Sequence, residues 1–113
     1  MISNELLSEV LGLEIDDMRR DNHTQNWIDY TTVYDDINQS SMINIYELAH
    51  KCKEWAYSLG HVVSTQYRTD YSNATTSLAW CESLAYEGRQ NFKADTEPEA
   101  IFRACEWILQ QTS

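Results

Sequence analysis

Residues 91–109 read NFKADTEPEAIFRACEWIL, which is typical of a short strand followed by a well-capped helix. Thr96 and Glu99 have the spacing of a capping box, in which each side chain accepts a hydrogen bond from the other residue's backbone N–H. Pro98 falls in the first turn, where the helix needs no N–H donor. One face of the predicted helix is apolar at i, i+3, i+4 and i+7: Ile101, Ala104, Cys105 and Ile108. This stretch predicts fold and indicates no activity.

Two further helices are predicted upstream. Residues 44–59 repeat apolar side chains with the helical period over four turns: Ile45, Leu48, Ala49, Cys52, Ala56 and Leu59. Asn44 is the expected N-cap, and Gly60 suits the left-handed position after the helix end. Residues 4–13 predict a shorter helix, capped by Ser3 or Asn4, which needs tertiary packing to persist.

Between the second and last helices, the chain alternates with the period of a strand. Residues 62–68, 75–84 and 89–94 predict three consecutive antiparallel strands joined by turns. Such a sheet must have at least one face covered, and the apolar helix faces supply that cover. We therefore predict one α+β domain over residues 1–113. It is a three-layer-like sandwich of an antiparallel sheet of about three to four strands, two main helices and a short N-terminal helix, with Trp80 in its core.

Residues 14–41 show no clean period and are predicted to be an irregular, acidic connecting segment, with a helical turn near residues 34–37. Long irregular segments in compact domains often carry function. This segment is therefore the first candidate for an interaction surface. The alternative is a wrapped surface loop pinned by Trp27 and Tyr30.

The formal net charge of −10 is unevenly distributed. Residues 1–50 hold ten acidic residues against Arg19 and Arg20, a net of −8, whereas residues 51–113 have a net of −2. This balance disfavours direct binding of nucleic acid, which requires clustered Lys and Arg. It suits a partner with a basic surface, and its simplest alternative role is solubility.

No catalytic, cofactor-binding or metal-binding residue is predicted, and no cofactor. The chain has three cysteines, an odd number, and no Cys-x-x-Cys motif, so free thiols are expected, with Cys52 and Cys105 in the core. His23, His50 and His61 have no zinc-site spacing with Cys52, Cys81 or Cys105. The acidic pairs Asp16/Asp17 and Asp35/Asp36 would diverge on most backbones, and three glycines are few for a phosphate-binding loop.

The N-terminus has no basic region followed by an apolar one, and no apolar run approaches the length of a membrane span. We therefore expect a cytoplasmic protein, in a bacterial host cell, that does not contact a membrane.

Three stretches resemble a family of short phage and prophage proteins, the phage ABA-sandwich domain. NELLSEVLGL at residues 4–13 is similar to the family's opening helix, NIYELAHKCKEWA at 44–56 to its central helix, and KADTEPEAIFRAC at 93–105 to its closing motif. The resemblance implies an α–β–α layered domain of phage origin. It brings no catalytic residues. Residues 14–41 depart from the family's short, Pro-containing linker.

Together these observations predict a non-enzymatic phage or prophage accessory protein that binds a host or phage protein with a basic surface. The partner-binding residues expected are Asp16, Asp17, Trp27, Asp29, Tyr30, Asp35 and Asp36. In a sharper version the protein inhibits a host nucleic-acid-binding defence complex, with carboxylates standing where phosphates would sit. One alternative is self-association as a homodimer through an edge strand, residues 89–94 or 62–68. A small hydrolase is a third interpretation.

Overall fold

The computed structural model describes residues 2–20, 26–33, 41–69, 75–83 and 89–112. The elements follow in the order α1 (Asn4–Leu11), β1 (Ile15–Arg20), β2 (Trp27–Thr32), β3 (Ser41–Asn44), α2 (Ile45–Ser58), β4 (His61–Thr69), β5 (Thr75–Ser83), β6 (Arg89–Ala94) and α3 (Glu97–Thr112). The strands form two three-stranded antiparallel sheets, β1–β2–β3 and β4–β5–β6. The predicted α+β class, with two main helices and a short N-terminal helix, is confirmed.

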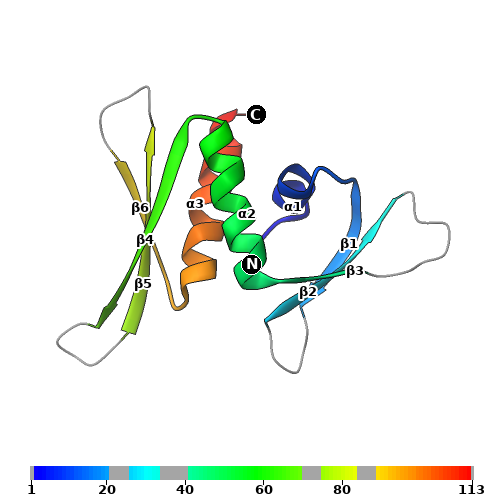
Figure 1. Cartoon of the computed structure of the whole chain (residues 1–113), viewed down its shortest axis with the longest axis horizontal. Helices are drawn as coiled ribbons and strands as arrows, with labels where there is room; N and C mark the ends of the chain where they lie inside the picture. Colours follow the sequence, from blue (N-terminus) through cyan, green and yellow to red (C-terminus); the bar gives the residue numbers. More distant parts are fainter. Residues whose placement is uncertain (1, 21–25, 34–40, 70–74, 84–88, 113) are drawn as a thin grey trace.

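The helices form the middle layer, and the two sheets lie at opposite ends of the molecule's long axis (Figure 1), which measures 49 Å. α3 packs against all three strands of β4–β5–β6, and α1 packs against β1 and both other helices. This order differs from the α–β–α layers that the family resemblance implies. A helix covered on more than one side needs a broad apolar surface, and α3 buries Ala100 and Phe102 in addition to its predicted stripe.

The predicted helix caps are present. The Thr96 hydroxyl accepts from the N–H of Glu99 at 3.4 Å, and the Asn44 side chain accepts from the N–H of Tyr46 at 2.9 Å. Gly60 adopts a φ of 87°, the left-handed conformation expected after a helix end. Leu59 departs from the prediction: the helix ends at Ser58, so the helical period no longer applies and Leu59 is exposed.

The prediction of an irregular segment over residues 14–41 is wrong for its described part, which forms strands β1 and β2 and the beginning of β3. The strands are short, and a bulge between Ile15 and Asp17 breaks the alternation of β1. β2 has large hydrophobic side chains on both faces, since Trp27 is exposed and Ile28 is fully buried. The alternation of apolar and polar residues that identifies a strand is therefore not visible in this stretch.

The second sheet matches its prediction closely, since no strand boundary differs by more than a residue. Its inner face rests on α3: Val63 is buried, and the Thr65 hydroxyl donates to the Glu97 carboxylate at 2.6 Å. One contiguous core includes Ile28 and Ile43 of the first sheet together with Ala94 of the second. Trp80 was predicted to be buried, but its side chain is not among those that the structure describes.

Candidate protein-interaction surface

The β1–β2–β3 sheet has one face turned toward the helices and one turned away. Ile28 and Ile43 are paired and buried, so they mark the inner face. Side chains alternate between faces along a strand, and directly paired residues share a face. In the register of this sheet Asp29 is opposite Met42, and Asp17 is opposite Thr31. The opposite side, named the outer face below, includes Asp17, Trp27, Asp29, Thr31 and Met42, and in β1 the register pairs Arg19 with Asp29.

The outer face combines apolar side chains with carboxylates. Trp27 is 38% exposed and Met42 is 54% exposed, although both are large hydrophobic residues. Tryptophan and methionine are enriched at protein interfaces. Asp17 is exposed and Asp29 half-buried beside them. Val33, which directly follows β2, adds a further exposed apolar side chain. This composition suits a protein partner that offers both an apolar contact and positive charge.

The predicted partner-binding residues do not all lie on the same surface. Asp17, Trp27 and Asp29 share the outer face, and Asp16 is exposed at the bulge of β1. Tyr30 was expected among the partner-binding residues, but it is half-buried, lies on the inner face and packs against the core. Because side chains alternate along a strand, Tyr30 lies on the face opposite to Trp27. The sequence alone did not show which face each of them takes. Asp35 and Asp36 lie outside the described residues.

Met42 was missed by the sequence reasoning. It lies in β3, a strand of four residues, too short for an alternation pattern to be recognised. Only its pairing with Asp29 places it on the outer face. The sequence that could have indicated this strand is Ser41-Met-Ile-Asn44. In it Ile43 lies between the exposed Met42 and the polar Asn44, which is the N-cap of α2.

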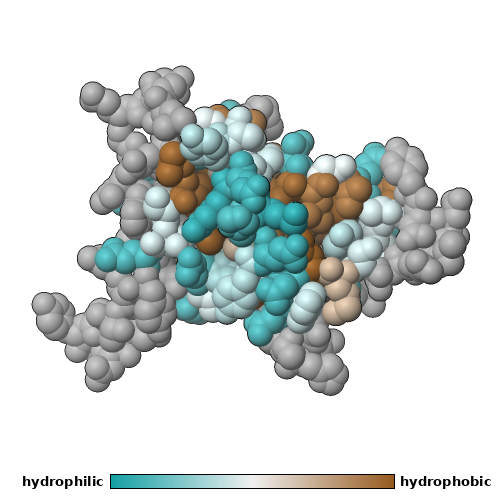
Figure 2. All heavy atoms as spheres, viewed as in Figure 1, coloured by the Kyte–Doolittle hydropathy of each residue, from teal (hydrophilic) through white to brown (hydrophobic). Residues whose placement is uncertain are grey.

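Figure 2 shows that the visible surface of α2 is mainly hydrophilic. His50 pairs there with Glu54, four residues on, at 2.9 Å, and both side chains are well exposed. Cys52 lies on the opposite, buried side of the helix, so it and His50 point apart. Within the described part of the chain, no group of three or more His, Cys, Asp or Glu residues could hold a metal ion.

Cys52 and Cys105 are free, buried thiols at the contact between α2 and α3, as predicted. The Cys105 thiol donates to the backbone carbonyl of Cys52 at 3.6 Å. The hydrogen bond with the Cys105 side chain raises the pKa of the Cys52 thiol, and burial raises it further. Because the thiolate is the nucleophilic form, Cys52 is suited to packing and not to covalent chemistry.

Because the pKa of the Cys52 thiol is raised in the folded state, the protein should lose stability at alkaline pH. The stabilisation is complete below pH 9.0, the thiol's ordinary pKa. It is lost as pH rises further, because the unfolded thiol releases its proton and the folded thiol does not. Between pH 8 and 10 the free energy of unfolding should fall through this group, by on the order of 1 kcal/mol. Urea unfolding of wild type and Cys52→Ala measures it: the variant should lack this part of the decline, and equal slopes would contradict the prediction.

A hollow of about 620 Å³ lies between α1 and α3 and is lined by Glu5, Glu9 and Glu106 among others. The Glu106 carboxylate is already engaged, because it accepts from the Ser3 backbone N–H at 2.7 Å and from the Ser3 hydroxyl at 3.0 Å. These bonds hold the start of α1 on α3. The geometry therefore gives Glu106 a structural role.

The fold and the outer face define a small α+β protein with a helical layer between two antiparallel sheets and an exposed, acidic and apolar sheet face. No protein-family model, curated protein or solved structure matches the chain. The resemblance to phage ABA-sandwich proteins accordingly stays a prediction. No membrane-crossing helix, by length and apolar character, is found among the described residues.

Proposed function

We propose that this chain is a non-enzymatic accessory protein of phage or prophage origin that acts by binding another protein through the outer face of β1–β2–β3. The observation that carries the proposal is the joint exposure of Trp27 and Met42 on a sheet face that also holds Asp17 and Asp29. The phage origin rests on the sequence resemblance of residues 4–13, 44–56 and 93–105.

The chemistry of this face specifies the kind of partner. A tryptophan and a methionine supply apolar area that a partner can desolvate, which is how interface hot spots are built. The carboxylates of Asp17 and Asp29 on the same face favour a partner with Lys or Arg at the matching positions, and they speed its approach. The partner is therefore a protein with a basic surface. In the sharper form of the proposal, that surface is one that ordinarily binds nucleic acid, and the carboxylates take the place of phosphates.

The proposal is tested by affinity capture from a bacterial lysate, treated with nuclease, with three forms of the tagged protein. The wild type should retain a basic protein that elutes as salt rises, because screening weakens exposed charge pairs. A variant with Asp17→Asn, Trp27→Ala and Asp29→Asn should retain at least about tenfold less of it, equivalent to a loss of about 1.4 kcal/mol or more.

A control variant removes the same kinds of side chain elsewhere. Tyr46→Ala, with Glu9→Gln and Glu47→Gln, takes away one exposed aromatic and two exposed carboxylates from α1 and α2. It has the same net charge as the outer-face variant and should capture the partner as the wild type does. Equal capture by the two variants, or capture that depends on intact nucleic acid, would contradict a role for the outer face.

A further inference from the structure

Four strands lie at the edges of the two sheets, β1, β3, β4 and β6. Exposed edges invite pairing with another chain, and proteins prevent this with bulges, charges, prolines or short strands. β1 carries a bulge and adjacent acids, and β3 has four residues. β6 begins with Arg89 and includes Lys93. Three of the four edges therefore carry a protective feature.

β4 has no bulge or proline, is not short, and carries a single charged residue, Arg68. It has nine residues, His61–Thr69, with no proline, glycine, lysine or acidic residue. It pairs with β5 in an unbroken register from His61 to Thr69. Val62, Val63 and Thr65 are β-branched and favour extended pairing. An edge of this length, about 30 Å at 3.3–3.4 Å per residue, can pair with another strand along its whole extent.

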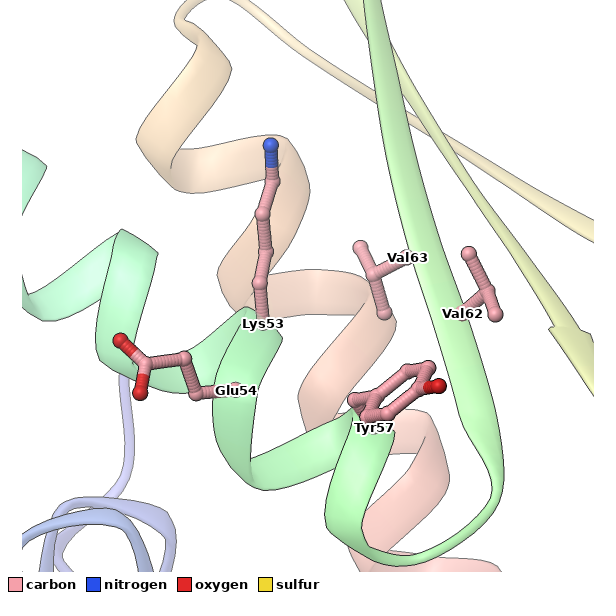
Figure 3. A pocket seen from close by; sticks show the side chains of 5 residues that line it. All are labelled: Lys53, Glu54, Tyr57, Val62 and Val63. Carbon is pink, nitrogen blue, oxygen red and sulfur yellow. The ribbon is translucent and has the colours of Figure 1, made fainter.

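A hollow opens beside this edge. It has a volume of about 400 Å³ and is lined by Lys53, Glu54 and Tyr57 of α2 and by Val62 and Val63 of β4. Figure 3 shows the Tyr57 ring and the Val63 side chain on the two sides of this hollow, with β4 running past it. Tyr57 is 65% exposed, so a large aromatic side chain stands next to the free edge without cover.

We propose that two copies of this chain pair through β4, antiparallel across a two-fold axis, to form a continuous six-stranded sheet. A two-fold interface requires a surface that is complementary to itself, and an antiparallel pair of identical segments that contain no acidic residue and several β-branched ones meets this requirement. The second copy would also cover the hollow and the exposed ring of Tyr57.

The distribution of charge favours β4 as the place where a second copy of this chain binds. The net charge of −10 makes two copies repel each other wherever their acidic surfaces meet. β4 contains no acid, and its one formal charge is that of Arg68. The edge strand β1, in contrast, presents Asp16 and Asp17. β3 has no charged residue but only four positions, so among the described edges β4 combines the greatest length with a single charge.

Sedimentation equilibrium of the full chain tests the proposal. A strand-pairing interface of this size is at the weak end of specific interfaces, so dimers should form at about 1–300 µM. The mass should rise from 13.2 kDa toward twice that value over this range. Ser64→Lys with Gln66→Lys places like charges across the axis and should weaken dimerisation by about tenfold or more.

Two comparisons make the result specific to β4. Gln90→Lys with Asn91→Lys adds the same charge at exposed positions of the other edge, β6, and should leave dimerisation unchanged. A Ser64→Glu, Gln66→Glu variant mixed with the lysine variant should restore a dimer, since opposite charges then face each other. If circular dichroism shows the double lysine variant to be misfolded, Gln66→Lys alone, at an exposed position, replaces it.

Several results would overturn the proposal. A monomer at every concentration excludes the dimer, and a dimer that resists the β4 lysines but dissociates with the β6 lysines places the interface at the other edge. A dimer that neither pair affects places it elsewhere on the molecule. None of these outcomes bears on the outer face of β1–β2–β3, so the proposed function is tested separately.

Discussion

Replacing Phe102 by alanine should lower the free energy of unfolding by about 3–5 kcal/mol. Phe102 is 1% exposed and is the largest fully buried side chain described, in the helix α3 that packs against α1, α2 and the second sheet. Its removal leaves a cavity that the layers on both sides cannot easily close. Because small domains are stable by about 5–15 kcal/mol in total, the variant should lose a large share of its stability. Urea denaturation followed by circular dichroism measures the loss.

The matched control is Tyr46→Ala, which also truncates an aromatic side chain of a helix. Tyr46 is 58% exposed, so its loss should change the free energy of unfolding by no more than about 0.5 kcal/mol. Similar losses in the two variants would show that α3 does not lie at the centre of the core.

Ile28→Ala is the second change with a large expected effect, a loss of about 2–5 kcal/mol. Ile28 is fully buried in the middle strand of β1–β2–β3 and belongs to the same core cluster as residues of α2 and α3. The result measures whether the N-terminal sheet is an integral part of one domain. The readout is again urea unfolding, with the slope of the transition recorded alongside its midpoint, because the slope scales with the surface that unfolding exposes.

The neighbouring residue supplies the comparison. Trp27→Ala removes a larger side chain from the same strand, but from the outer face, where it is 38% exposed. It should therefore cost less stability than Ile28→Ala and should weaken partner capture. A loss below about 1 kcal/mol for Ile28→Ala would indicate that the first sheet contributes little to the core.

The sequence predicted best those elements whose local signals agree with their tertiary surroundings. In α3 the cap at Thr96 and the stripe ending at Ile108 point to the same helix, and α2 is similar with Asn44 as its cap. The strands β4 and β5 have nine residues each, long enough for alternation to be visible. β1 was missed because a bulge breaks its alternation, β2 because it has large side chains on both faces, and β3 because four residues give too few repeats. The placement of the helices between two sheets follows from long-range contacts, which no local pattern reports.

The kinds of residue at the candidate site could be predicted from the sequence, whereas their arrangement in space could not. Charge counts drew attention to Asp17 and Asp29, and the aromatic count to Trp27. Which of them share a face depends on strand register, which a one-residue shift reverses. For that reason Tyr30 was grouped with Trp27 among the partner-binding residues although it lies on the inner face, and Met42 was overlooked.

The bond between Ser3 and Glu106 has a consequence for synthesis of the chain. The two residues are 103 positions apart, so at about 5–20 residues per second the ribosome makes Glu106 about 5–20 s after Ser3. In the later part of that interval, after residue 44 has been made, α1 and strands β1–β3 have been synthesised without α3, and their apolar inner surfaces lack part of their cover. The nascent N-terminal half is therefore the segment most exposed to chaperones and proteases, and the domain can close only when its last helix emerges.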